Sequence, residues 1–287
     1  MEKFGLSAAL LTPFSSDFEV DTRRMTDLAR HVLNNGTDTV TFLGTTGEGA
    51  SVGTTERARI LQAAAEAEID ADRIILGICA SSVSGSVDQI EQGVASGVTE
   101  FLLTPPFYFS DYDDDALFDW HSGVLRGSPE GARFVVYNIP QVTGVTLSAE
   151  LIGRLADAFP GRIRAVKDSS GSWASTENFL RADVVPVLVG DERQLARAIR
   201  EGAAGAISGM ANLHPEFMRH IVDTGEDNPT LSAVVDAVVS LPVVAAIKCV
   251  LADDLGDPGW QVLRPPLRRL ADAEKDTLRT AVAAARG

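Results

Sequence analysis

Short apolar runs alternate with longer amphipathic segments along this chain, and this alternation limits the fold more than any other feature. The apolar runs recur at intervals of roughly thirty residues, which is the length of one strand–helix unit. Most of them are continuously apolar, as expected for strands of a parallel sheet covered on both faces. Eight runs of this kind occur, at residues 6–11, 39–43, 74–79, 100–104, 134–138, 163–167, 186–189 and 205–208.

Eight strands, each followed by a helical segment, predict an α/β protein with a closed (β/α)8 TIM barrel. The alternative is an open doubly wound sheet, which should carry a glycine-rich dinucleotide-binding turn after its first strand. Residues 12–21, which follow the first run, contain no glycine, so the barrel is favoured. We expect the barrel to span residues 1–210 and a C-terminal helical extension, residues 211–287, to pack on it.

The charge balance excludes several classes of partner. A net charge of −15 argues against binding to nucleic acid or to an anionic membrane surface.

The sequence shows no signal peptide and no apolar run long enough to span a membrane. Cys79 and Cys249 lie in apolar runs, so we expect two buried, reduced thiols in a cytoplasmic protein.

Lysine is the most informative residue type, because only four of the 25 basic residues are lysines. Lys167 ends the sixth apolar run, and residues at the carboxyl ends of barrel strands face the active site. Desolvation there favours an uncharged amine, which can attack a ketone. The alternative is an ion pair with Asp168. Lys248 lies in an apolar helical segment, and we expect its side chain to extend to the surface.

Other strand ends carry further polar groups. Residues 44–48 (GTTGE) follow the second run, and their backbone N–H groups and hydroxyls suit a carboxylate or phosphate, although an ordinary turn would look similar. Tyr137 ends the fifth run, one strand from Lys167, where it could relay a proton or form part of the rim. The aromatics of residues 104–109 suit either a site or an interface. The four histidines show no zinc-binding spacing, so a metal-dependent aldolase is disfavoured.

Several motifs together identify a family resemblance over nearly the whole chain. GTTGE (44–48), TPPFYF (104–109), YNIP (137–140), VKDSSG (166–171), GDE (190–192) and GAISG (205–209) occur in this order. In order and spacing, the chain resembles the dihydrodipicolinate synthase and N-acetylneuraminate lyase family of class I aldolases. The resemblance implies an enzyme that binds pyruvate or another 2-oxo acid as a Schiff base and uses an aldehyde as its second substrate. It implies no metal or organic cofactor.

The resemblance also implies roles for individual residues. Lys167 would form the imine, and Tyr137 would transfer protons and help to position the carboxylate. Thr45 would connect Tyr137 to a proton relay, while Thr46 and the backbone around Gly47 would hold the carboxylate. Tyr108 resembles the tyrosine that such proteins lend to a neighbouring subunit of a homotetramer or dimer. The backbone near Ile207 would flank the bound pyruvate. The other candidate substrate-binding positions are Ser169, Gly190, Glu192 and Ser208.

One position departs from the synthase branch of this family. Dihydrodipicolinate synthases usually carry an arginine two residues after the proline of YNIP, where it binds the carboxylate of aspartate semialdehyde. Val142 stands there in this chain, and the loss of a charged hydrogen bond costs about 1.5–3 kcal/mol, or roughly ten- to hundred-fold in recognition. We therefore predict cleavage of a 2-keto-3-deoxy sugar acid or a related hydroxylated 2-oxo acid, with Ser169, Glu192 and Ser208 binding its hydroxyls.

Other activities stay open at this point. The synthase reaction itself is one alternative, and a dehydratase or an aldolase for 4-hydroxy-2-oxo acids would share the imine chemistry. A non-catalytic barrel that only binds a 2-oxo acid would bind ligand without turnover. A barrel enzyme that binds phosphate through residues 44–48 would bind phosphorylated ligands and ignore pyruvate.

Overall fold

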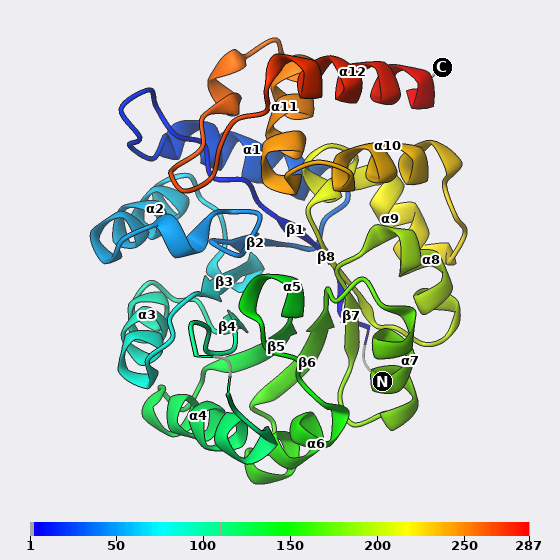
Figure 1. The fold of residues 1–287 in the computed structure, drawn as a ribbon. Helices are drawn as coiled ribbons and strands as arrows, with labels where there is room; N and C mark the ends of the chain where they lie inside the picture. Colours follow the sequence, from blue (N-terminus) through cyan, green and yellow to red (C-terminus); the bar gives the residue numbers. More distant parts are fainter. Residues whose placement is uncertain (1–2, 110, 287) are drawn as a thin grey trace.

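Eight parallel strands close into a barrel in the computed structural model, which describes residues 3–109 and 111–286 (Figure 1). The strands follow one another around the barrel in chain order, and β1 pairs with β8 to close it. This is the fold that the alternating apolar runs predict. The strands are β1 (Gly5–Ala9), β2 (Thr39–Phe42), β3 (Ile74–Ile78), β4 (Glu100–Leu103), β5 (Arg133–Asn138), β6 (Ile163–Asp168), β7 (Val187–Val189) and β8 (Gly205–Ser208).

The predicted strands are all confirmed, and their ends differ from the prediction by at most two residues. The differences arise because apolar residues continue past a strand end; Leu10 and Leu11 follow β1 and are fully buried. None of the helices in the described ranges has the length and hydropathy of a membrane span. The α-helices of the described residues are α1 (Thr22–Asn34), α2 (Thr54–Glu66), α3 (Val83–Ala95), α4 (Asp114–Gly127), α5 (Pro140–Thr143), α6 (Ala149–Ala158), α7 (Trp173–Ala182), α8 (Glu192–Arg200), α9 (Pro215–Thr224), α10 (Pro229–Val239), α11 (Val243–Leu255) and α12 (Asp272–Arg286).

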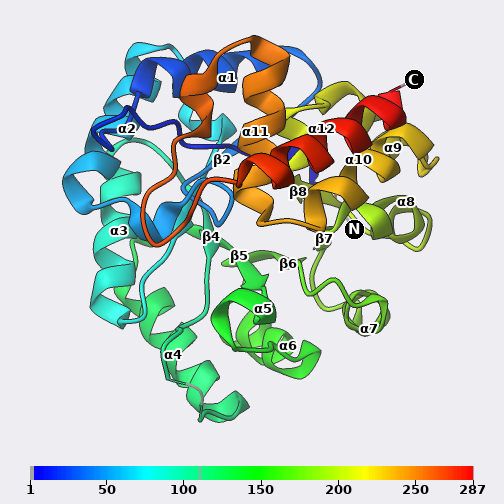
Figure 2. The ribbon, with the colours of Figure 1, turned by 45° about the horizontal axis from the view of Figure 1, so that its top comes forward.

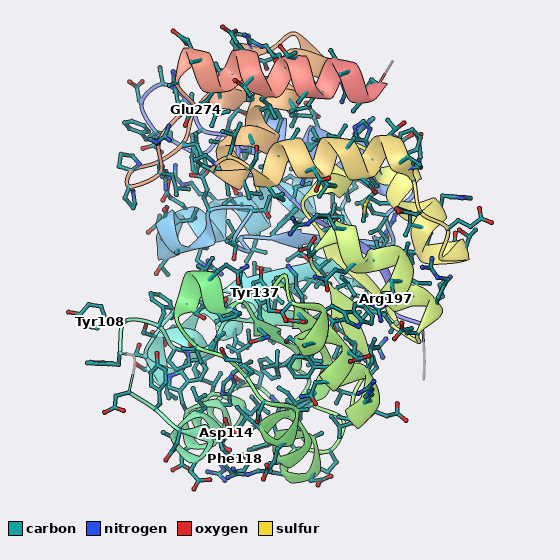
Figure 3. The ribbon with its side chains drawn as sticks, turned by 45° about the vertical axis from the view of Figure 1, so that its right-hand side comes forward. Tyr108, Asp114, Phe118, Tyr137, Arg197 and Glu274 are labelled. Carbon is teal, nitrogen blue, oxygen red and sulfur yellow. The ribbon has the colours of Figure 1, made fainter. Side chains whose placement is uncertain are left out.

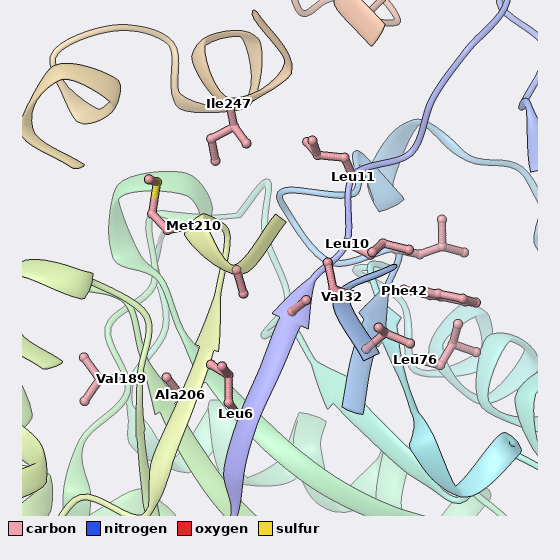
Figure 4. Packing of buried hydrophobic residues seen from close by; sticks show 14 of the residues in the cluster. Leu6, Leu10, Leu11, Val32, Phe42, Leu76, Val189, Ala206, Met210 and Ile247 are labelled. Atoms are coloured by element: carbon pink, nitrogen blue, oxygen red, sulfur yellow. The ribbon is translucent and has the colours of Figure 1, made fainter. Parts of the chain in front are cut away.

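Alternate residues of each strand point into the barrel and away from it. Outward side chains, such as Leu6, Val189 and Ala206, pack against the surrounding elements in one large core (Figure 4). Inward side chains form a separate small cluster, which includes Ala165 on β6. Lys167 follows Ala165 by two residues and therefore continues the inward row toward the carboxyl end of the barrel.

The helices after β8 reach the strand-end face of the barrel. Helices α10 and α12 lie side by side, and α11 contacts both of them (Figures 1 and 2). Helix α11 also contacts the short 3-10 helix η3 (Met210–Asn212) that follows β8. A division of the chain at residue 210 stays a prediction.

Two expectations about buried groups need correction. Lys248 does not extend to the surface: its side chain is fully buried on α11 and forms an ion pair with Glu48, which is also fully buried. The helical pattern around Lys248 indicates an apolar environment but not a partner 200 positions earlier in the chain. Both cysteines are free; Cys249 is buried as predicted, whereas Cys79 is partly exposed because it lies just beyond β3.

Candidate active site

Lys167 and Tyr137 face each other across two adjacent strands. They are direct partners in the register between β5 and β6, and Nζ of Lys167 lies 4.2 Å from the centroid of the Tyr137 ring. Only 5% of Lys167 and 3% of Tyr137 is exposed. The amine and the phenol-bearing ring therefore meet at the carboxyl end of the barrel interior, which is where barrel enzymes place their chemistry.

The Lys167 amine has no carboxylate partner within the part of the chain that the structure describes, because no such oxygen lies within 4.0 Å of it. Asp168 points to the opposite side of the strand and has its own donors. Its carboxylate accepts hydrogen bonds from Asn138 at 2.8 Å, from Thr176 at 2.8 Å and from both the backbone and the hydroxyl of Ser170 at 3.1 Å. The ion pair with Asp168 considered above is therefore absent.

A cavity of about 360 Å³ opens above this pair of side chains. A volume of this size suits a small organic molecule. The predicted site residues that line it are Thr45, Thr46, Tyr137, Lys167, Ser169, Gly190, Glu192 and Ile207.

The turn after β2 is held rigidly beneath one side of the cavity. Glu48 adopts a left-handed backbone conformation with φ of 53°, and its carboxylate accepts hydrogen bonds from Lys248 and, at 3.1 Å, from the backbone N–H of Arg264. The Thr12 hydroxyl donates to the Gly47 carbonyl at 2.6 Å. A Cβ atom at Gly47 would lie 2.8 Å from the Leu10 carbonyl oxygen, so the turn requires glycine there. Thr45 and Thr46 are thus presented to the cavity from a fixed backbone.

Gly190 brings the end of β7 close to the Lys167 side chain. A Cβ atom at this position would lie 1.8 Å from Oγ of Ser169 and 3.0 Å from Cε of Lys167. Real Cβ contacts are not this short, so any side chain at residue 190 would displace one of these two groups. Residue 190 must therefore be glycine if the Lys167 amine is to keep its position.

Glu192 begins α8 and supplies a carboxyl group to the same cavity. It accepts hydrogen bonds from the Ser208 hydroxyl and from the backbone N–H of Met210. Burial raises the pKa of the Glu192 carboxyl above its usual value, and the hydrogen bond from Ser208 acts in the opposite direction. Such a carboxyl group can both accept and, when protonated, donate a hydrogen bond to a substrate hydroxyl.

Three of the predicted site residues do not line this cavity. Ser208 acts through its contact with Glu192, and Gly47 lies within the packed turn. Tyr108 lies on the loop after β4 with 88% of its surface exposed, and it points away from the body of the molecule (Figure 3). Within a single chain Tyr108 is therefore remote from Tyr137.

Apolar side chains that no sequence pattern assigned to the site line much of the cavity. Ile139 and Val142 come from the segment at the end of β5, and further members come from α10, α11 and the residues between the strands and these helices. The apolar stripes of the C-terminal helices were visible in the sequence, but a stripe does not reveal which surface it covers. These further members are Met210, Val238, Val239, Val243, Val244 and Ile247.

The cavity also contains charged residues at its mouth. Arg193 lines it with 45% of its side chain exposed, and its guanidinium donates to Asp191 at 2.9 and 2.7 Å.

Residues 3–109 and 111–286 contain no group of three or more histidine, cysteine, aspartate or glutamate side chains that could hold a metal ion.

Fold and cavity together define a (β/α)8-barrel enzyme with a buried amine at its strand ends. The model of the dihydrodipicolinate synthetase family matches residues 2–285. The chain therefore belongs to this family, whose members are Schiff-base lyases and aldolases that act on pyruvate.

Similar proteins carry more than one description within this family. An uncharacterized DapA-like lyase of Chloroflexus aurantiacus is 32% identical and aligns with 98% of this chain and 96% of its own length. A crystal structure of dihydrodipicolinate synthase from Agrobacterium tumefaciens superposes with a TM-score of 0.95 at 44% identity, covering 98% of this chain and 99% of the other. A 2-keto-3-deoxygluconate aldolase variant of Sulfolobus solfataricus shares the fold, with a TM-score of 0.83 at 19% identity over 98% and 96% of the two chains.

Proposed function

We propose that this enzyme cleaves a 2-keto-3-deoxy sugar acid or a related hydroxylated 2-oxo acid to pyruvate and an aldehyde, with Lys167 as the Schiff-base residue. The observation that carries the proposal is the unpaired amine of Lys167, buried beside the Tyr137 ring at the base of the cavity. A lysine amine that no carboxylate holds in place can reach the carbonyl carbon of a bound 2-oxo acid.

In the proposed reaction, the Lys167 amine adds to the C2 ketone and water leaves, which gives a protonated imine. Tyr137 accepts the proton of the C4 hydroxyl, the C3–C4 bond breaks, and its electron pair moves into the imine to form an enamine and a free aldehyde. Protonation at C3 and hydrolysis of the imine then release pyruvate and restore the amine. Thr45 supports the proton relay, while Thr46 and the turn backbone hold the C1 carboxylate; neither a metal nor an organic cofactor takes part.

The choice of a hydroxylated substrate depends on the groups around the rest of the cavity. Val142 lines it where the synthase branch carries an arginine, and valine has no group to bind a second carboxylate. Ser169 and Glu192 line it with hydrogen-bonding groups, and the backbone near Gly190 and Ile207 completes that edge. Ser208 donates a hydrogen bond to Glu192 and so supports that carboxyl group from behind. These groups suit hydroxyls near the bond that breaks.

Reduction of the imine tests the proposal directly. The protein is incubated with pyruvate and borohydride and then digested for peptide mass mapping, with Lys167→Arg and Lys275→Arg, a lysine that does not line the cavity, as a matched pair. The expected result is a pyruvate-derived adduct on the Lys167 peptide in the wild type and in Lys275→Arg, but not in Lys167→Arg. Ligand binding without an adduct would favour a non-catalytic barrel, and a preference for phosphorylated ligands would contradict the proposal.

The synthase reaction is the second candidate, and two observations favour it. The structure at 44% identity is described as a dihydrodipicolinate synthase, and Arg193 at the cavity mouth offers a cation that could replace the arginine missing at Val142. Asp191 already accepts hydrogen bonds from Nε and Nη2 of that guanidinium, which weakens its attraction for a further carboxylate. Faster turnover of aspartate semialdehyde than of any hydroxylated aldehyde would establish this second candidate.

We further propose that the enzyme is a cytoplasmic homo-oligomer, a tetramer or a dimer, in which Tyr108 enters the site of a neighbouring subunit. Tyr108 and Phe109 form an edge-to-face aromatic pair with 88% and 73% of their surfaces exposed. Tyr108 also has a φ of 95°, which costs a bulky residue roughly 1–3 kcal/mol unless further contacts compensate for it. A partner subunit would supply such contacts.

A further inference from the structure

The cavity above Lys167 has two chemically different sides. One side carries hydrogen-bonding groups at the ends of β6 and β7, including Ser169 and Glu192. The rest of the lining is mainly aliphatic, and we name its aliphatic residues the aliphatic wall. Ile139 and Val142 of this wall follow β5, with Gln141 between them as a polar neighbour whose amide donates to the Ser169 carbonyl. Its other members lie on α10 and α11 and are Val238, Val239, Val243, Val244 and Ile247.

The aliphatic wall extends from the buried base of the cavity to its exposed mouth. Val238 and Ile247 are each 1% exposed, whereas Val142 and Val243 are 59% and 42% exposed. Val142 and Val243 thus belong to the small set of large apolar residues on the described surface that water reaches freely. A ligand that covers them with alkyl groups removes this apolar surface from water, which favours binding.

A fully hydroxylated chain would fit this wall poorly. A hydroxyl group pressed against aliphatic side chains loses its hydrogen bonds to water and finds no partner, which is unfavourable. The wall also cannot readily move away. Ile247 lies within 3.0 Å of the position of a Cβ atom at Gly209, and it points from α11 toward the strand ends near Met210 (Figure 4). The next residue, Lys248, anchors the same helix through its buried pair with Glu48.

We infer that the aldehyde half of the substrate is amphipathic, with a hydroxyl close to the bond that breaks and an alkyl end of a few carbons against the aliphatic wall. This inference rests on the proposed function and narrows its substrate class. The hydroxyl faces Ser169 and Glu192, and the alkyl end leaves the cavity between Val142 and Val243. A sugar-derived aldehyde that lacks its terminal hydroxyls has this character, and a fully hydroxylated one does not.

The test compares aldehydes that differ only at the end remote from the carbonyl. Rates of condensation with pyruvate are measured for glyceraldehyde, lactaldehyde, 2-hydroxybutanal and 2-hydroxypentanal. We expect kcat/KM to rise from glyceraldehyde to lactaldehyde and then about three- to fourfold with each added methylene. The same series is measured in Val142→Thr and Val243→Thr, where the preference for the alkyl end should fall about threefold or more.

Val184→Thr is the matched control, because Val184 is 40% exposed but does not line the cavity. It should leave the preference unchanged. Borohydride reduction with pyruvate alone is carried out on every variant, so that loss of imine formation, which would contradict the proposed function, is seen separately. If the Lys167 adduct forms but glyceraldehyde or a longer polyol is preferred, if no aldehyde in the series is accepted, or if the two wall variants keep the wild-type preference, this inference is wrong.

Discussion

Glu48 and Lys248 form an ion pair in which both side chains are fully shielded from water. Nζ of Lys248 also donates to the Val262 carbonyl at 2.8 Å and lies 4.7 Å from the centroid of the Phe14 ring. The pair links two parts of the cavity lining. One is the turn that carries Thr45 and Thr46, and the other is α11, the helix that carries Ile247. One buried contact therefore fixes two sides of the cavity relative to each other.

Removal of one partner of this pair should destabilise the protein strongly. In Lys248→Met, the Glu48 carboxylate stays buried without its cation, and we expect a loss of about 3–5 kcal/mol in the free energy of unfolding. Urea unfolding at a fixed protein concentration measures this loss. The double variant Glu48→Gln/Lys248→Met should recover part of it, because no buried charge remains. A free energy of unfolding for Lys248→Met within about 0.5 kcal/mol of the wild-type value is what a surface substitution gives, and it would contradict this prediction.

Tyr137→Phe should separate imine formation from bond cleavage. The phenol oxygen is the proposed proton acceptor, and general acid–base groups contribute about 10²- to 10⁴-fold to a rate. We expect kcat to fall by this factor, while the borohydride adduct on Lys167 still forms. Tyr112→Phe is the matched control, because the Tyr112 hydroxyl donates to the Pro106 carbonyl and does not line the cavity. Equal activity in the two variants would rule out the role of Tyr137.

Gly190→Ala should slow the first step of the reaction. The added methyl group overlaps Oγ of Ser169 and crowds Cε of Lys167, so the amine moves from its position beside Tyr137. A displacement of about 1 Å can reduce a rate by about 10²-fold, and the rate of adduct formation with pyruvate measures this effect. Gly131→Ala, where a Cβ atom meets nothing within 4 Å, should leave that rate unchanged.

His121 should make stability depend on pH. Burial lowers the pKa of its imidazole to about 4 from 6.5, so the unfolded chain binds this proton more tightly than the folded one. The resulting contribution to stability, about 3 kcal/mol from the 2.5-unit difference, is complete above pH 6.5 and disappears as the pH falls toward 4.

Urea unfolding between pH 7 and pH 4 checks the effect of His121. His121→Gln, which carries no titrating group, should lose a slope of up to about 1.4 kcal/mol per pH unit in this interval. His31→Gln on the exposed side of α1 is the control and should keep the wild-type slope. Identical slopes in the wild type and His121→Gln would show that this imidazole is not responsible.

Tyr108 should affect both activity and assembly if it enters a neighbouring site. We expect Tyr108→Ala to lower kcat about tenfold or more at saturating pyruvate and to weaken oligomers in sedimentation experiments, because it removes an anchoring aromatic. Val184→Ala, also an exposed apolar residue, serves as the control. A monomeric wild-type protein with full activity would contradict the proposed oligomer.

The strands were predictable because their sequences report a local property. Ile163, Ala165 and Val166 suit a strand of a parallel sheet that is covered on both faces, so β6 and the position of Lys167 at its end followed directly. The pairing of Lys167 with Tyr137 followed from the chain-order arrangement of a barrel. Lys248 was misjudged because its environment depends on Glu48, a partner that helical periodicity does not reveal.

Parts of the site depend on contacts that no local pattern encodes. Helix α5 has only four residues, and its only sequence signal is Pro140 at its first position. The apolar stripe of α11 predicts burial of one face, but not that Val243 and Ile247 turn toward the strand ends. Val243 and Ile247 line the same cavity as Ser169 and Glu192 because α10 and α11 pack at the strand-end face of the closed barrel.

The cavity thus divides its lining between two parts of the chain. Lys167, Tyr137 and Gly190 sit on or beside barrel strands, where a change would disturb the bond-making centre, whereas Val238, Val243 and Ile247 sit on helices added after the eighth strand. Under the proposed function, substitutions in those helices would alter which aldehyde is accepted while the amine and its surroundings stay intact. A new substrate range would then require no change at the strand ends.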